Sequence, residues 1–193
     1  MKSAAILNDT DPISLNAFPE TQSAYKIPPM NIQVGIIMGS KSDWDVMSNV
    51  SKTLDKFGIG SENRVISAHR APKLLAEYCE SAEQRGIRIL ICGAGLAAAL
   101  PGVAAAHTSL PVLGVPLEAS QGLGGMDALM AIVQMPPGIP VGTLAIGKPG
   151  AINAAMLATA ILALNDEKIA AALQAFRAEQ TQTIADMPPP DQA

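Results

Sequence analysis

One of the two histidines in this 193-residue chain stands beside an arginine at the end of an apolar segment. In residues 65–72 (VISAHRAP) the apolar run ends at Ser67, and His69 and Arg70 follow. An imidazole titrates near neutral pH, so His69 could both give and take a proton. A guanidinium matches a phosphate or carboxylate with two hydrogen bonds, so Arg70 could hold an anion. The same pair would also fit a structural role, with the histidine closing a strand and the arginine solvated or in a salt bridge.

The second histidine, the two cysteines and the serine spacing do not indicate a metal site or a covalent nucleophile. His107 ends an alanine-rich helical pattern, where a helix C-terminus favours positive charge, so we interpret it as structural. Cys79 and Cys92 fall in a helical and a strand pattern, and we expect reduced core residues of a cytoplasmic protein. The chain has neither the ligand spacing of a metal site nor a Gly-x-Ser-x-Gly turn, so no metal is expected.

The elements that position these residues are five apolar segments separated by helical patterns. Strand patterns cover residues 33–38, 63–67, 87–93, 110–116 and 140–147. Helical patterns cover residues 42–58, 71–86, 96–107, 125–135, 150–166 and 167–184. This alternation favours a parallel sheet covered on both faces, and near-continuous apolar strands are what such a sheet requires. We therefore predict an α/β fold, a three-layer α/β/α sandwich with a parallel, flavodoxin-like sheet of about five strands.

In such folds ligands bind beyond the carboxyl ends of the strands, so the loops there hold the candidate site. After the first strand, Ser40, Ser42 and the backbone amides near Asp43 could cradle a phosphate or sugar hydroxyls. A plain helix start would explain the same residues, with Ser42 as the cap. In the third helical pattern, Pro101 is expected to bend or restart the helix.

The chain is predicted to form one domain over residues 32–186, after a flexible extension over residues 1–31 and before a loose tail over residues 187–193. Residues 89–117 carry no Asp, Glu, Lys or Arg, but glycines and prolines interrupt them repeatedly, so no membrane segment is expected. The extension carries acidic residues and no long apolar run, which is unlike a signal peptide.

Composition limits the partners of the domain. Hydrophobic residues make up 49% of the chain and charged residues only 16%, which predicts that part of the surface is buried between subunits of a homo-oligomer. The net charge of −4 and the lack of a basic tract argue against nucleic acid as a partner.

Taken in order, five stretches resemble the PurE family of purine biosynthesis. They are VGIIMGSKSDW, SAHR, GAG…LPG, LPVLGVP and IVQMPPGIPVGTLAIG, and the similarity extends over about residues 34–183. The resemblance implies an isomerase that converts N5-carboxyaminoimidazole ribonucleotide to 4-carboxy-5-aminoimidazole ribonucleotide without a cofactor. It also implies a cytoplasmic homo-octamer whose partner is a small ribonucleotide.

The resemblance further implies a role for nine residues. His69 is the catalytic proton carrier while the carboxyl group leaves as carbon dioxide, is held in a closed pocket and is added to the neighbouring ring carbon. The residues implied to bind the substrate are Ser40, Ser42, Asp43, Ser67, Arg70, Ala94, Gly95 and Leu100. The uncharged residues 93–102 would then supply walls that hold carbon dioxide without offering water.

The chain departs from the family pattern in one loop. Many members read G-A-G-G-A-A-H-L-P-G there, whereas this chain has Leu96 for the glycine and Ala99 for the histidine. A scheme with two histidines is therefore in doubt, and a divergent, non-catalytic nucleotide-binding paralogue stays an alternative. A second alternative is the direct aminoimidazole ribonucleotide carboxylase, a lyase. Because that animal-type branch has lysine after the histidine, Arg70 favours the mutase branch.

Overall fold

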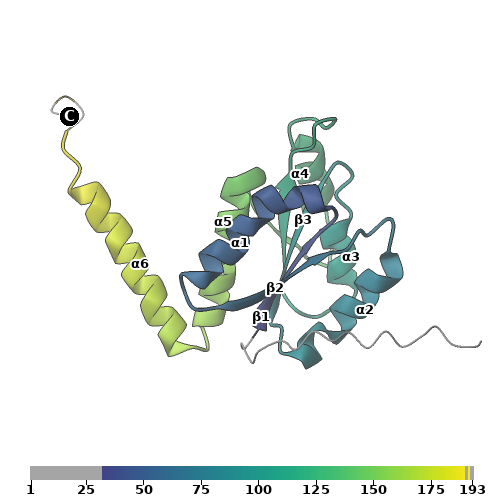
Figure 1. The fold of residues 1–193 in the computed structure, drawn as a ribbon, viewed down its shortest axis with the longest axis horizontal. Helices are drawn as coiled ribbons and strands as arrows, with labels where there is room; N and C mark the ends of the chain where they lie inside the picture. The colour runs from purple at the N-terminus through teal and green to yellow at the C-terminus, as the bar shows by residue number, and fades with distance from the viewer. Residues whose placement is uncertain (1–31, 190, 192–193) are drawn as a thin grey trace, which may run out of the picture.

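The computed structural model describes residues 32–189 and 191, which form a five-stranded sheet between two layers of helices (Figure 1). All four strand pairings are parallel and the strand order is β2-β1-β3-β4-β5, the order of flavodoxin-like folds. The strands are β1 (Ile32–Met38), β2 (Gly60–Val65), β3 (Ile89–Gly95), β4 (Val112–Leu117) and β5 (Gly142–Thr143). The predicted fold class is confirmed, and the predicted extension over residues 1–31 lies outside the described residues.

The helices follow the predicted order with different bounds. They are α1 (Trp44–Asp55), α2 (Pro72–Ala82), α3 (Leu100–Ala106), α4 (Met126–Val133), α5 (Gly147–Ala163) and α6 (Glu167–Ala185), with short 3-10 helices η1 (Lys41–Asp43) and η2 (Glu83–Arg85). No helix among the described residues is both long enough and apolar enough to cross a membrane.

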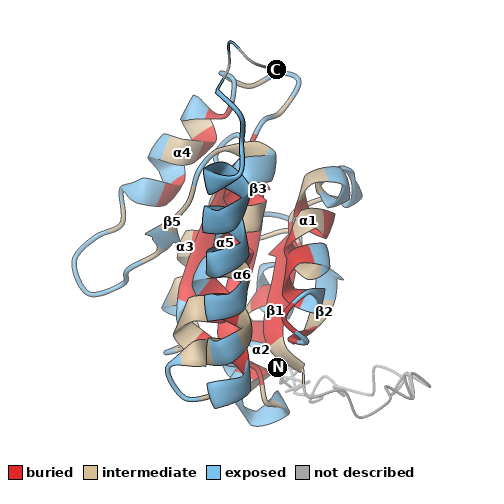
Figure 2. Ribbon diagram, turned by 90° about the vertical axis from the view of Figure 1, so that its left-hand side faces the viewer, coloured by how far each residue is buried: buried red, intermediate tan, exposed pale blue. Residues whose placement is uncertain are grey.

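The pleat of the central strands divides the core between the two faces of the sheet. Ile36 and Ile91 belong to the cluster that packs against α1 and α5, whereas their neighbours Ile37 and Cys92 belong to the cluster under α2, α3 and α4. Successive side chains of a strand point to opposite faces, so strands apolar at every position can fill both layers. Figure 2 shows most of β1 and β3 buried, with intermediate residues only at the start of β1 and the end of β3. At Gly93 a Cβ atom would lie 2.4 Å from the sulfur of Met47, so only glycine lets α1 pack this closely.

The two cysteines are free and buried, in the helix and the strand predicted for them. Burial raises the pKa of the Cys79 thiol to about 11 and raises that of Cys92 as well. Both thiols are therefore protonated at neutral pH and behave as apolar core groups.

The edge strand β2 is held against α2 by a polar cluster. The Tyr78 hydroxyl donates to Glu62 Oε1 at 2.8 Å, and Arg85 forms a salt bridge with the same carboxylate. The Arg85 guanidinium also lies over the Tyr78 ring, 4.5 Å from its centroid. Burial is the largest cause of the raised pKa of the Tyr78 phenol, so it acts as a neutral donor. The cluster fixes the strand that carries the loop with His69.

Three sequence-based expectations about element ends are wrong. Ser40, not Ser42, caps the first helical turn, because its side chain accepts from the Ser42 amide while Asp43 accepts from the Ser40 amide. The third helix begins at Leu100 rather than at residue 96, with Pro101 in its first turn, where a missing N–H group is harmless. The fifth strand keeps only two of its eight predicted residues, Gly142 and Thr143, which pair with β4, and the last predicted strand residue, Gly147, already begins α5.

Helix α6 leaves the body of the domain after its first turns (Figure 1). Ile169 and Leu173 are buried, and the Phe176 ring meets the edge of Phe57 with 5.5 Å between centroids. Residues 177–189 are exposed. The last half of this helix therefore has no packing partner within the described part of the chain.

Candidate active site

The loops that follow β1, β2 and β3 meet in one cleft of about 270 Å³ at the carboxyl edge of the sheet. In this strand order β1 lies between β2 and β3, so the chain connections leave a crevice there. The cleft is lined by all nine residues that the sequence assigned to the site: Ser40, Ser42, Asp43, Ser67, His69, Arg70, Ala94, Gly95 and Leu100. Their placement agrees with the prediction, while the role of each one stays a prediction.

The first loop presents a compact group of hydroxyl and amide donors. The Ser40 amide donates to Asp43 Oδ2 at 2.9 Å, and the Ser42 amide donates to Ser40 Oγ at 3.3 Å. The Ser40 and Ser42 hydroxyl groups lie 2.9 Å apart. Burial raises the pKa of the Asp43 carboxyl, although amide hydrogen bonds and the charge of Arg70 act in the opposite direction. The loop is thus ordered by its own hydrogen bonds before a ligand arrives.

Arg70 ties the second loop to the first. Its Nη2 donates to the Gly39 carbonyl oxygen at 3.0 Å, and its Nε donates to Ser67 Oγ at 3.2 Å. Within residues 32–189 it forms no salt bridge with a carboxylate, so the structural alternative of an ion-paired arginine is not what the fold shows. The guanidinium has further N–H donors at the cleft, which could bind an anion.

His69 stands in the turn between β2 and α2. The turn is closed by the Ala71 amide, which donates to the Ser67 carbonyl oxygen at 2.9 Å. The imidazole is exposed and lines the cleft, and no hydrogen bond commits its ring nitrogens to another described residue. Both nitrogens are therefore available for proton transfer with a ligand.

His107 occupies different surroundings, as its structural interpretation requires. It is the C-cap residue of α3, and its Nδ1 lies 3.2 Å from Glu80 Oε1. It does not line the cleft.

The loop after β3 supplies uncharged walls. The residues of this loop that line the cleft before α3 begins are Ala94, Gly95, Leu96, Ala98 and Ala99. Gly95 fits there because a Cβ atom would lie 3.1 Å from the Leu117 carbonyl oxygen. Leu96 and Ala98 have φ angles of +55° and +37°, a left-handed conformation that glycine adopts more easily.

Sequence reasoning left out three residues that also line the cleft, Gly39, Ala68 and Ala119. Leu96, Ala98 and Ala99 line it too and belong to the uncharged wall predicted over residues 93–102. Ala119 comes from the loop after β4, and its position two residues beyond that strand was the signal that could have found it. Small apolar residues carry no chemical signature in a sequence, so only the strand-end rule identifies them.

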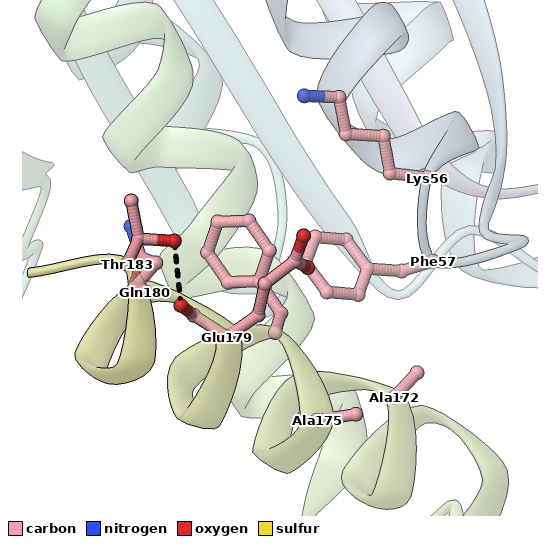
Figure 3. A pocket seen from close by; sticks show the side chains of 8 residues that line it. Lys56, Phe57, Ala172, Ala175, Glu179, Gln180 and Thr183 are labelled. Atoms are coloured by element: carbon pink, nitrogen blue, oxygen red, sulfur yellow. Dashed lines mark hydrogen bonds between the residues drawn. The ribbon is translucent and has the colours of Figure 1, made fainter. Parts of the chain in front are cut away.

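A second hollow of about 590 Å³ lies far from this edge, between α6 and the end of α1 (Figure 3). Phe57, Phe176 and the side of α6 line it, together with Lys56 and Glu179. It contains no histidine and no cluster of small donors. Across residues 32–189 and 191, no three His, Cys, Asp or Glu side chains are grouped as metal ligands.

Comparison with known proteins gives consistent matches. A model of the family described as AIR carboxylase matches residues 33–183. The N5-carboxyaminoimidazole ribonucleotide mutase of Vibrio parahaemolyticus is 59% identical over 159 residues, which cover 82% of this chain and 98% of that protein. The mutase of Pseudomonas aeruginosa is 55% identical over 164 residues, 85% of this chain and all of that protein (100%). The crystal structure of Treponema denticola PurE is 28% identical, with a TM-score of 0.72 over 80% of this chain and 94% of that one.

Proposed function

The chain belongs to the AIR carboxylase family, and on this premise we propose that it is an N5-carboxyaminoimidazole ribonucleotide mutase of purine biosynthesis. The observation that supports this activity best is the cleft itself. It combines one imidazole free of hydrogen bonds to described residues, one anchored arginine and a serine-rich loop at a single sheet edge. The relatives of this name match over more than four fifths of the chain.

The reaction is an isomerisation that needs no oxidant and no second substrate. The bond between the exocyclic nitrogen and the carboxyl carbon breaks, and its electron pair stays on nitrogen, which takes up a proton. The neighbouring ring carbon then forms a bond to the carbon of carbon dioxide and loses its own proton. We infer that His69 donates the first proton and accepts the second, a shuttle worth roughly 10² to 10⁴ in rate.

The phosphate and ribose would occupy the polar side of the cleft. Ser40, Ser42 and Arg70 offer hydroxyl, amide and guanidinium donors there, and Ser67 and the Gly39 carbonyl group fix the guanidinium. A ribonucleotide anchored in this way would have its base ring toward the loop with Ala94 and Gly95, which line the same cleft. Holding carbon dioxide next to the ring carbon replaces a dilute encounter with a positioned one.

The second candidate activity is direct carboxylation of aminoimidazole ribonucleotide, which the description of the matching family favours. Purified protein is given either the N-carboxylated substrate or the aminoimidazole with bicarbonate, and carboxylated product is measured. A mutase converts the N-carboxylated substrate at a much lower enzyme concentration than it needs to convert the aminoimidazole with bicarbonate. A direct carboxylase converts the aminoimidazole with bicarbonate instead. Binding of ribonucleotide without turnover of either substrate would instead support the non-catalytic paralogue.

We also propose that the protein is a homo-oligomer, an octamer by family resemblance, in the cytoplasm. Two unpartnered surfaces support assembly: the outer half of α6 beside its hollow (Figure 3), and the exposed Met126, Met130 and Val133 of α4. Two free cysteines suit a reducing compartment. Light scattering of the purified chain measures the oligomer, and a monomer at micromolar concentration would contradict it.

A further inference from the structure

The backbone of Leu96 is unusual for a leucine. Residues 95–98 form a turn in which the Ala98 amide donates to the Gly95 carbonyl oxygen at 3.1 Å. Leu96 is the first central residue, with φ +55°, and the second does not share the positive φ. This is the φ pattern of a type II′ turn, whose first central position ordinarily takes glycine. A Cβ atom there crowds the following carbonyl group, so glycine would relieve strain that leucine maintains.

Core packing does not account for the leucine. Leu96 is 48% exposed, whereas Ala98 at the end of the turn and Leu100 beyond it are each only 3% exposed. Replacing Leu96 by glycine would therefore remove little buried apolar surface from the fold. A strained residue with an exposed side chain points to a role in the site rather than in folding.

The position of Leu96 in the cleft suggests that role. Leu96 and Leu100 are the only apolar side chains larger than alanine among the described residues that line it. Leu100 is only 3% exposed, so Leu96 alone among the lining residues combines apolar bulk with access to solvent. His69, Arg70 and the serines of the first loop line the same cleft.

We propose that Leu96 covers the bound substrate and keeps water out of the cleft while the carboxyl group exists as carbon dioxide. The inference rests on the proposed mutase activity and adds a residue that determines how much carbon dioxide is captured. Carbon dioxide is uncharged, so enclosure rather than ion pairing must retain it. When it escapes, the exocyclic nitrogen keeps the electron pair and its new proton, and the products are the free amine and dissolved carbon dioxide.

The test follows substrate labelled with ¹³C in its carboxyl group, converted by the full chain in excess unlabelled bicarbonate. The variants are Leu96→Ala, which removes the bulk and keeps the strain, and Leu96→Gly, which removes both. The matched control is Leu74→Ala, a leucine of α2 that is 44% exposed and does not line the cleft. Released amine and label retained in the product are measured together with the melting temperature.

Both Leu96 variants are expected to raise the ratio of released amine to product roughly tenfold, the usual effect of removing an apolar contact. Leu74→Ala is expected to keep the wild-type ratio. Leu96→Gly is expected to melt about 2 °C above Leu96→Ala, because only glycine relieves the turn.

A wild-type ratio in both Leu96 variants, with an active wild-type enzyme, would overturn the covering role and leave the mutase activity standing. A change in oligomeric state that fully accounts for the altered ratio would also overturn it, since Leu96 would then be an interface residue. If the wild-type chain fails to convert the labelled substrate at all, the proposed function fails first, and the inference fails with it.

Discussion

His69 and His107 are the same side chain in two different situations. His69 stands in a turn at the carboxyl edge of the sheet, lines the cleft and has Arg70 beside it. His107 ends α3 on the outside of the domain, with Nδ1 3.2 Å from Glu80. The difference shows that an imidazole becomes a candidate for catalysis when its ring nitrogens are uncommitted and face a ligand-sized space. Residue type and sequence neighbours are not sufficient to identify a catalytic histidine.

The largest expected effect separates the two histidines. His69→Asn is expected to lower turnover of the carboxylated ribonucleotide by roughly 10² to 10⁴, because asparagine cannot carry a proton at neutral pH. Binding of the ribonucleotide, measured by calorimetry, should persist because the phosphate donors are intact. His107→Asn serves as the matched control with near-normal turnover. Comparable losses in both variants would erase the distinction between the two sites.

The arginine beside His69 gives the next effect. Arg70→Ala is expected to raise KM by roughly 10- to 100-fold, the usual worth of a hydrogen bond to a charged group. Arg70→Lys should recover only part of this, because an ammonium group cannot donate to Ser67, Gly39 and an anion in one plane. Arg64→Ala, an exposed arginine on β2 outside the cleft, is the control. A KM unchanged in Arg70→Ala would remove the arginine from substrate binding.

The carboxylates near the two histidines should differ in their effect on stability. Burial raises the pKa of Asp43 above its ordinary value of 3.8. The Asp43 carboxyl therefore holds its proton more tightly in the folded state than in the unfolded state. The stability that this bound proton contributes is lost as pH rises through the pKa of the folded state. Between pH 3.8 and neutrality, Asp43→Asn should gain free energy of unfolding relative to wild type. Urea titrations across that range measure the gain, and Glu80→Gln should not reproduce it.

The smallest effect concerns the surface pair of His107 and Glu80. His107→Gln removes the contact with Glu80, whose side chain is 62% exposed, and should lower the free energy of unfolding by about 0.5 kcal/mol. The loss should shrink in 1 M salt, where exposed charges are screened. Urea denaturation at two salt concentrations measures it. A salt-independent loss would show that packing at the end of α3, not the ion pair, keeps His107 in place.

Much of the fold could be read from local patterns. Five apolar segments separated by amphipathic ones predicted the parallel sheet, because each segment must bury one or both faces. The strand-end rule then placed His69, Arg70 and the first serine loop together. Element ends were less predictable. Ser40 and Ser42 are both good caps, and which one serves depends on where Asp43 can reach back to an amide.

The sequence by itself determined the layer architecture, the buried thiols and the group of residues that meets at the carboxyl edge of the sheet. The layers, the buried thiols and the strand-end loops follow from hydrophobic periodicity and parallel topology, whereas the individual site residues follow from the resemblance to the PurE family. Only the tertiary structure decided that Arg70 bridges to Gly39, that Leu96 occupies a strained turn and that α6 leaves the domain. The Arg70 bridge and the departure of α6 depend on contacts between segments distant in sequence, or on their absence. The Leu96 turn is local, but its residue types do not predict it, because glycine is what such a turn ordinarily takes.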